Sequence, residues 1–342
     1  AQGCRSLVPM ERLSVMGLVE VVRHLPELVA IRRRLLRHFL DQRPDVFVGI
    51  DAPDFNLGLE ARLRARGVPS VHYVSPTVWA WRPGRVKTIV NAVDLMLSTY
   101  PFEVDFLRRH AVPVRYVGHP LAEEIPLAVD REAARRSLGL PAARAWIAVL
   151  PGSRISEVKR LAHPFIETAN WCLQRRPGLR FVAPLVNERV RDLFFRELQR
   201  TAPHLPFSLV SGRSREVIAL ADVVLTASGT ATLETLLLKR PMVVAYRLNA
   251  VSYHIVKSLR LVKVPFIAMA NLLAGEALAP EFLQQRCRAD LLGPSLLNFL
   301  DDPERVRAIQ ARYGQIHREL RRDASREAAQ AVLGLIGAWR DD

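Results

Sequence analysis

Short apolar runs alternate with longer amphipathic segments along almost the whole chain, and this alternation restricts the folds that the sequence can form. The apolar runs have the length of β-strands, and apolar residues in the segments between them recur at helical spacing. This alternation is typical of βαβ units and parallel sheets, so we expect an α/β protein. The predicted strands are 46–50, 70–74, 94–99, 114–117, 146–150, 179–184, 207–210, 222–226 and 242–246.

The same pattern divides the chain. A stretch rich in proline and acidic residues at 119–129 interrupts the alternation, which restarts after Asp130. Because 342 residues is about twice a typical domain, we expect two Rossmann-like, doubly wound domains, 1–124 and 125–321. From about residue 289 the pattern is helical to the end of the chain. The first strong strand begins only at residue 46, so an upstream βα unit is expected to be missing, in line with the absent start Met.

The charge of the chain indicates its partners. The formal net charge is +15, and this favours an anionic partner: nucleic acid, anionic lipid or a phosphorylated substrate. No zinc-finger spacing, aromatic ribonucleoprotein motif or basic-region heptad is present, so nucleic acid is the weakest of the three.

The three cysteines lie far apart and form neither a disulfide framework nor a CxxC pair, which fits a reducing cytoplasm. The histidines show no metal-binding spacing, and no run is apolar enough to span a bilayer or resembles a signal peptide.

Two carboxylates follow the predicted strand 46–50. Asp51 and Asp54 stand where this strand ends, and ligands of open α/β sheets bind beyond the carboxyl ends of the strands. The strand is apolar throughout and is expected to be buried on both faces. A buried carboxylate at its end is a candidate general base, with Asp51 first and Asp54 as the alternative.

A second candidate site follows the predicted strand 146–150. Gly152 and Ser153 allow the backbone to approach a ligand closely, and the next helix begins with unpaired N–H groups that suit phosphate. Arg154 could add a bidentate contact to an anion. The alternative is an ordinary βα turn with a surface arginine. The spacing of a Walker P-loop is absent.

A similar turn follows the predicted strand 222–226. Ser228, Gly229 and Thr230 again suit phosphate at a helix start, and Glu234 could accept hydrogen bonds from the hydroxyls of a ribose. The alternative is a capping box in which Ala231 or Thr232 leads into Glu234. Two such turns in one domain favour a nucleotide site.

Two further segments combine aromatic or apolar residues with arginines. Trp79, Trp81 and Arg82 lie in a proline-containing loop after strand 70–74, and either pack inward or line a binding cleft. The segment 15–29 is apolar over more than one helix face and precedes a cluster of four arginines, which suits either a core helix or a membrane-surface helix. The candidate membrane residues of this segment are Val19, Val22, Leu25 and Leu28.

Together these motifs resemble the lipid-A-disaccharide synthases, which join two acylated glucosamines in the assembly of outer-membrane lipid A. The matching stretches are 16–21, 50–56, 72–82, 117–120, 150–154, 227–231 and 271–275. The resemblance implies a GT-B fold, in which two Rossmann-like domains face a cleft and the C-terminal helix, about 322–342, packs back on the first domain. Asp51, Arg154, Glu234 and Asn271 match residues implicated in the family's activity.

The resemblance also implies the reaction and its place in the cell. The donor would be UDP-2,3-diacylglucosamine, the acceptor 2,3-diacylglucosamine 1-phosphate, and the products a β-1,6-linked disaccharide and UDP, with inversion at the anomeric carbon. The family needs no metal or other cofactor, and works at the cytoplasmic face of the inner membrane of Gram-negative bacteria. An anionic membrane surface is therefore an expected partner, nucleic acid is not, and a homodimer stays open.

The chain departs from the family's pattern at two places. Nothing matches the Gly-rich loop with which the family begins, and Met269-Ala270 precedes Asn271 where Leu-Pro is more frequent. Three alternatives therefore stay open: a UDP-sugar 2-epimerase, a UDP-sugar transferase with a soluble acceptor, and a truncated, inactive module that binds lipid or nucleotide.

Overall fold

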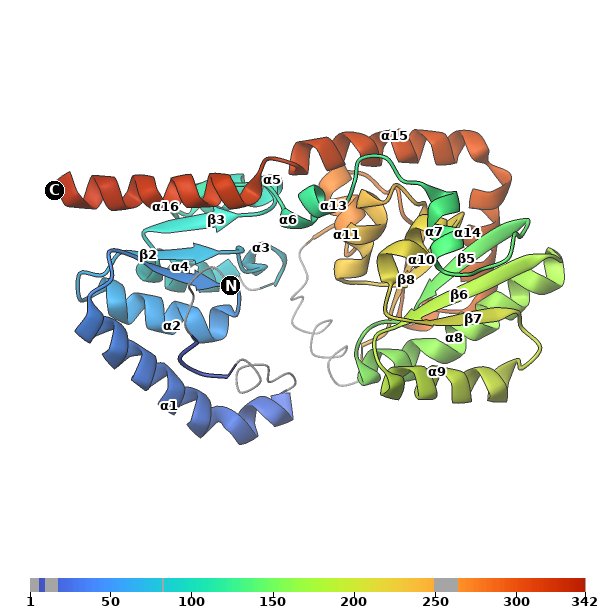
Figure 1. The fold of residues 1–342 in the computed structure, drawn as a ribbon, viewed down its shortest axis with the longest axis horizontal. Helices are drawn as coiled ribbons and strands as arrows, with labels where there is room; N and C mark the ends of the chain where they lie inside the picture. Colours follow the sequence, from blue (N-terminus) through green and yellow to red (C-terminus); the bar gives the residue numbers. More distant parts are fainter. Residues whose placement is uncertain (1–5, 10–17, 82, 249–263, 342) are drawn as a thin grey trace. The chain divides into compact units, whose positions relative to one another are not determined.

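The computed structural model describes residues 6–9, 18–81, 83–248 and 264–341, which form two compact α/β units (Figure 1). The first unit comprises Ala1–Gly118 and Asp323–Asp342, and the second comprises His119–Arg322. The described part of each unit contains one sheet, and every strand pair described in the two sheets is parallel. The expected α/β class is therefore confirmed.

The first unit has a four-stranded sheet with the order β1-β2-β3-β4. Its strands are β1 (Phe47–Ile50), β2 (Ser70–Tyr73), β3 (Leu95–Ser98) and β4 (Val114–Tyr116). Its helices are α1 (Leu18–Gln42), α2 (Pro53–Arg64), α3 (Val78–Trp81), α4 (Val86–Ala92), α5 (Pro101–Arg109) and α16 (Ala324–Asp341).

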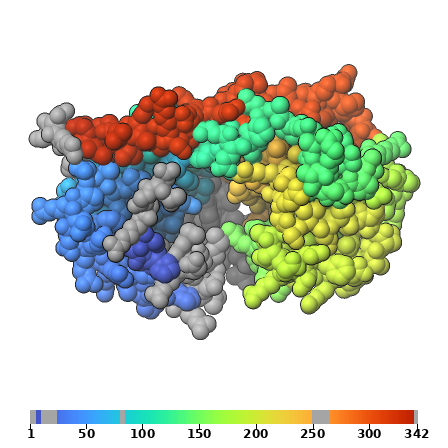
Figure 2. All heavy atoms as spheres, in the orientation of Figure 1, coloured from blue at the N-terminus to red at the C-terminus, as the bar shows by residue number. Residues whose placement is uncertain are grey.

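Helices cover this sheet on both faces. On one face, α2, α4 and α5 share a core with the strands, centred on Leu57, Ile89, Met96 and Leu107. The other face is covered by α16, which contacts β2 and β3 (Val71, Leu97) through Ala331. Figure 2 shows α16 as a red band on the surface of the first unit. The C-terminal helix thus belongs to the unit that contains the start of the chain.

Strand β1 is not buried on both faces, contrary to expectation. Phe47 and Gly49 face α1 and α2, whereas Val48 is 38% and Ile50 63% exposed. The reason is the sheet order: β1 is an edge strand among the described residues, and α16 packs on the neighbouring strands. An apolar run in the sequence does not reveal whether its strand lies at an edge.

The second unit has a six-stranded sheet with the order β10-β9-β8-β5-β6-β7. Its strands are β5 (Ala145–Leu150), β6 (Leu179–Leu185), β7 (Phe207–Ser211), β8 (Val223–Ala227), β9 (Met242–Tyr246) and β10 (Glu281–Leu283). Its helices are α6 (Pro120–Glu124), α7 (Arg131–Ser137), α8 (Ile155–Arg175), α9 (Glu188–Thr201), α10 (Ser214–Leu220), α11 (Thr230–Leu237), α13 (Met269–Ala274), α14 (Ala289–Asp301) and α15 (Pro303–Leu320).

The order of this sheet creates a topological switch point. The chain runs outward from β5 through β6 to β7, then returns to the other side of β5 with β8 and continues outward. At such a point the loops that follow the two central strands diverge and leave a crevice. None of the described helices is long and apolar enough to span a membrane.

Candidate functional site

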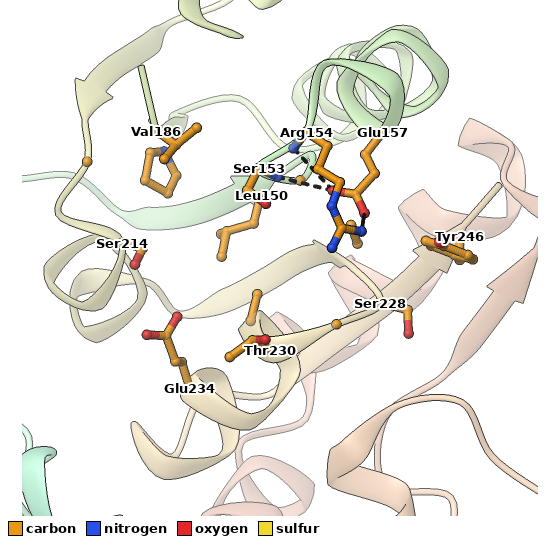
Figure 3. Close-up of a pocket in the computed structure, with 16 residues that line it drawn as sticks. Leu150, Ser153, Arg154, Glu157, Val186, Ser214, Ser228, Thr230, Glu234 and Tyr246 are labelled. Atoms are coloured by element: carbon orange, nitrogen blue, oxygen red, sulfur yellow. Dashed lines mark hydrogen bonds and ion pairs between the residues drawn. The ribbon is translucent and has the colours of Figure 1, made fainter. Parts of the chain in front are cut away.

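A pocket of about 370 Å³ lies at the switch point of the second unit, beyond the carboxyl ends of β5, β6 and β8. It brings together the two turns that the sequence singled out, the β5–α8 turn and the β8–α11 turn (Figure 3). Its polar lining is Gly152, Ser153, Arg154, Glu157, Gly212, Ser214, Ser228, Gly229, Thr230 and Glu234, and Pro184, Val186 and Tyr246 add apolar or aromatic surface.

The β5–α8 turn is built around a carboxylate that sequence analysis missed. Glu157, in the first turn of α8, accepts hydrogen bonds of 3.3 Å from the backbone N–H groups of Ser153 and Arg154. It also pairs with the Arg154 side chain at 3.2 Å. The N–H groups that we expected to be open to phosphate are therefore occupied by Glu157. A glutamate three residues after the N-cap is one half of a capping box, but Arg154 stands where that motif has Ser or Thr, so the sequence contains only part of the signal.

Gly152 is required in this turn for two reasons. Its φ of +115° is a conformation that residues with a side chain rarely adopt. A Cβ atom at this position would also lie only 2.7 Å from the side chain of Glu157. The glycine therefore allows the Glu157 carboxylate to fold back over the turn, while the Arg154 side chain stays 57% exposed at the pocket.

The β8–α11 turn contributes the opposite side of the pocket. Gly229, with a φ of +150°, precedes α11, and Thr230 and Glu234 lie on the helix facing the pocket (Figure 3). The capping-box alternative for Glu234 is wrong, because the N-cap of α11 is Gly229, which has no side chain, and Glu234 lies beyond the first turn. Its carboxylate instead pairs with Arg215 at 3.4 Å. Arg215, which sequence analysis missed, also binds Glu124 at 2.8 Å. Nothing in the sequence near Arg215 signals this contact, which forms only in the folded unit.

The pocket has the chemistry of a nucleotide site. The N-termini of α8 and α11 both border it, and helix N-termini favour negative charge, although Glu157 already engages two N–H groups of the β5–α8 turn. Arg154 adds an exposed cation that is paired with Glu157, while Glu234 offers acceptor oxygens for sugar hydroxyls. Val186 and Tyr246 provide surface against which a base could pack.

A second group of candidate residues lies in the first unit, at the end of β1. Asp51 and Asp54 are both exposed, so the expectation of a buried carboxylate is wrong. Among the described residues β1 is an edge strand with Ile50 63% exposed, which accounts for the exposure of the residues that follow it. Asp54 pairs with Arg85, whereas Asp51 sits in a left-handed turn with Ala52, at φ values of +50° and +43°.

The aromatic loop after β2 is partly anchored inward. Trp79 packs edge-on against Phe102, with ring centroids 4.8 Å apart, and its indole N–H donates to Glu103 at 3.0 Å. This supports the packing alternative for Trp79. The side chain of Trp81 and the whole of Arg82 lie outside the described residues.

Asn271 lies apart from the pocket lining. It is 1% exposed, and its side-chain amide bonds to both backbone groups of Ala279 and to Glu281. These bonds hold the segment between α13 and β10 together. A direct part of Asn271 in the reaction stays a prediction.

The candidate membrane segment belongs to α1. Leu25 is 51% exposed and Leu28 is half-buried, while the side chains of Val19 and Val22 lie outside the described residues. The arginines that follow on α1 are Arg32, Arg33, Arg34 and Arg37. In the described part of the chain, no group of three or more His, Cys, Asp or Glu side chains is arranged to hold a metal ion.

Comparisons with known proteins place this geometry in context. A family described as "Lipid-A-disaccharide synthetase" matches residues 1–335. The lipid-A-disaccharide synthase of Alkalilimnicola ehrlichii is 52% identical over 339 residues, 98% of this chain and 88% of that protein. The lipid-A-disaccharide synthase of Pseudomonas paraeruginosa is 54% identical over 337 residues, 98% of this chain and 87% of that protein.

Two solved structures share the fold at low identity. UDP-GlcNAc 2-epimerase from Neisseria meningitidis, bound to UDP-GlcNAc, has a TM-score of 0.62 and 12% identity over 94% of this chain and 84% of that one. A UDP-forming trehalose-phosphate synthase from Burkholderia vietnamiensis has a TM-score of 0.58 and 15% identity over 92% of this chain and 76% of that one. They support the GT-B fold.

Proposed function

Since the chain belongs to the lipid-A-disaccharide synthetase family, we propose that it transfers an acylated glucosamine from UDP to a second acylated glucosamine. The donor in this proposal is UDP-2,3-diacylglucosamine and the acceptor is 2,3-diacylglucosamine 1-phosphate. The products are the β-1,6-linked disaccharide 1-phosphate and UDP. The observation that carries the proposal is the switch-point pocket, in which Arg154, Glu234 and two helix N-termini converge.

The proposed reaction is a single displacement with inversion. The 6-hydroxyl oxygen of the acceptor attacks the anomeric carbon, its proton passes to the carboxylate of Asp51, and the bond from the anomeric carbon to UDP breaks. Positive charge develops on the sugar ring as in glycoside hydrolysis, and negative charge develops on the departing diphosphate. Arg154 and the N-termini of α8 and α11 stabilise that negative charge.

Asp51 is the preferred base because of its position and its exposure. It follows a strand end, where ligands of such sheets bind, and its carboxylate is open to a substrate. Asp54 is the second choice, since its carboxylate is already paired with Arg85. Glu234 is assigned to the ribose hydroxyls and is held in place by Arg215.

Membrane association is part of the proposal. Both substrates carry acyl chains, and the exposed Leu25 followed by four arginines on α1 suits an apolar surface with anionic headgroups. This supports a peripheral position on the inner membrane of a Gram-negative bacterium.

The test measures UDP release and the disaccharide product with both acylated substrates. Product that requires both substrates supports the proposal. UDP release with an unacylated, soluble acceptor would favour a UDP-sugar transferase that uses a soluble acceptor. Conversion of UDP-GlcNAc without UDP release would favour a UDP-sugar 2-epimerase. UDP binding without turnover of any substrate would leave only a nucleotide-binding module.

A further inference from the structure

The turn that carries Asp51 adopts a backbone conformation that its residues do not favour. Asp51 and Ala52 have φ values of +50° and +43°, in the left-handed region, which aspartate adopts more readily than most residues but alanine rarely does. Such a conformation persists only where surrounding contacts impose it. Two successive residues of this kind at a proposed catalytic position therefore require a specific constraint.

The side chain of Asn56 supplies that constraint. Its amide nitrogen donates to the carbonyl of Asp51 at 2.8 Å and to the carbonyl of Ile50 at 3.2 Å. The backbone N–H of Asp51 donates to the backbone carbonyl of Tyr73 on β2 at 2.9 Å. Both backbone polar groups of Asp51 are thus fixed, one to the sheet and one to the first helix turn.

Asn56 is itself held in register by a buried polar pair one helical turn further along α2. Glu60 lies at 2.7 Å from Nδ1 of His72 on β2, and both side chains are 0% exposed. A Cβ atom on Gly49 would collide with Glu60 and would lie 3.2 Å from Cβ of Asn56. Only glycine at this position therefore lets α2 lie close enough to β1 for both contacts.

Burying this pair costs free energy. Oε2 of Glu60 and Nε2 of His72 have no hydrogen-bond partner among the described residues. Burial raises the pKa of Glu60, although the hydrogen bond and charge of His72 oppose this effect. A buried polar pair with unsatisfied atoms calls for an explanation beyond packing, because apolar side chains could fill the same space.

We propose that Asn56 is a positioning residue for Asp51, and that the Glu60–His72 pair and Gly49 set the register of α2 that lets Asn56 reach the turn. This inference rests on the proposed function, in which the Asp51 carboxylate accepts the proton of the acceptor hydroxyl. A base displaced by about 1 Å can lose about a hundredfold in rate, so a fixed turn is worth its conformational cost. Asn56 acts through Asp51 and touches no reacting atom.

Three single variants test the proposal. Asn56→Ala removes the donor, Asn56→Asp keeps the shape but places a carboxylate against two carbonyl oxygens, and Asn91→Ala removes an exposed asparagine of α4 as the control. For both Asn56 variants we expect kcat to fall by about tenfold or more, while KM and the Kd for UDP change less than about twofold. Asn56→Asp should lose at least as much as Asn56→Ala, because it adds repulsion.

Two further measurements separate the turn from the proposed reaction. In Asn56→Ala, the amides of residues 51, 52 and 54–56 should exchange hydrogen faster, while those of β2 stay protected. Adding Ala52→Gly should restore part of kcat, since glycine accepts the left-handed conformation without strain. If both Asn56 variants keep kcat within twofold, or if exchange at 51–56 is unchanged, the proposal is wrong. If the wild-type protein releases no UDP from the acylated pair, the proposed function fails, and the exchange measurement still decides whether Asn56 holds the turn.

Discussion

The indole nitrogen of Trp79 donates a hydrogen bond of 3.0 Å to Glu103, a carboxyl group that is 1% exposed. Ser98 donates a second hydrogen bond, of 2.5 Å, to the same group. Burial raises the pKa of Glu103 to about 7, and the hydrogen bonds from Ser98 and Trp79 oppose this rise without cancelling it. The aromatic loop is therefore tied to a carboxyl group that titrates near neutral pH.

This pKa predicts that Glu103 lowers the stability of the protein as pH rises. The folded state holds the proton up to about pH 7, whereas the unfolded chain releases it near 4.5. Between these values the folded state binds more protons, so the free energy of unfolding falls as pH increases. Between pH 5 and pH 8, the free energy of unfolding measured in urea should fall less in Glu103→Gln than in the wild type. The difference between the two falls should be on the order of 1–3 kcal/mol.

The control for this prediction is Asp105→Asn, an exposed carboxylate on the same helix. Its pH dependence should follow that of the wild type. Parallel curves for Glu103→Gln and wild type would show that Glu103 titrates at an ordinary pKa.

Asp51→Asn tests the proposed base. Asparagine tolerates the left-handed conformation of this turn, so we expect the fold to be retained. Loss of the base should lower kcat by about a hundredfold or more, while the Kd for UDP stays unchanged. Unchanged turnover, measured as UDP release, would remove Asp51 from this role, and the same assay on Asp54→Asn would then test the second carboxylate.

Glu234→Ala tests the assignment of this carboxylate to the ribose. A site that hydrogen-bonds a hydroxyl disfavours the analogue that lacks it, so the wild type should bind UDP more tightly than 2′-deoxy-UDP. The variant should lose most of that difference, which titration calorimetry measures directly. Glu188→Ala, an exposed glutamate on α9, is the control and should keep the difference. Equal discrimination by wild type and Glu234→Ala would refute the assignment.

For two glycines in helices of the second unit, we expect substitution by alanine to change stability in opposite directions. A Cβ atom on Gly293 of α14 would collide with the ring of Trp171 on α8, so Gly293→Ala should destabilise by about 1–3 kcal/mol. At Gly314 of α15 the nearest atom is a flexible arginine nitrogen 3.7 Å away. Gly314→Ala should therefore be neutral or stabilise by up to about 1 kcal/mol. Thermal unfolding of both variants checks this ordering, and equal effects would contradict it.

Leu25→Ser tests the membrane surface of α1. Leu333→Ser is the matched control, because Leu333 of α16 is 66% exposed and Leu25 51% exposed in the same unit. Binding to vesicles that contain phosphatidylglycerol should weaken severalfold in Leu25→Ser and stay unchanged in Leu333→Ser. It should also weaken with salt, since Arg33, Arg34 and Arg37 of α1 are exposed to screening. Binding that responds to neither salt nor Leu25→Ser would place the membrane contact elsewhere.

The sequence predicted those features of the fold that depend on local pattern. All nine expected strands form, because each is an apolar run between helical segments. The strand β10 was missed, since its three residues begin with Glu281 and show no alternation. The prediction that β1 is buried on both faces was wrong, because the position of a strand in its sheet is set by tertiary structure.

The residues of the candidate site also divide into those that a local sequence pattern predicts and those that it does not. Gly152, Arg154 and Glu234 were found because their residue types follow predicted strands, and all three line the pocket. Arg215 was missed because its partners lie 19 or more residues away in the chain, and the contact of Glu103 with Trp79 was missed because these residues are 24 apart. Contacts of this kind appear only when the fold is known.

The carboxylate of Glu157 has a consequence for how the pocket fills. It satisfies the two N–H groups of the β5–α8 turn and pairs with Arg154, so these donors are already engaged by an anion. Entry of a diphosphate at this turn is thus an exchange of one anion for another. Under the proposed function, Glu157 therefore competes with the diphosphate for the same donors, which weakens nucleotide binding at this turn and favours release of the spent nucleotide.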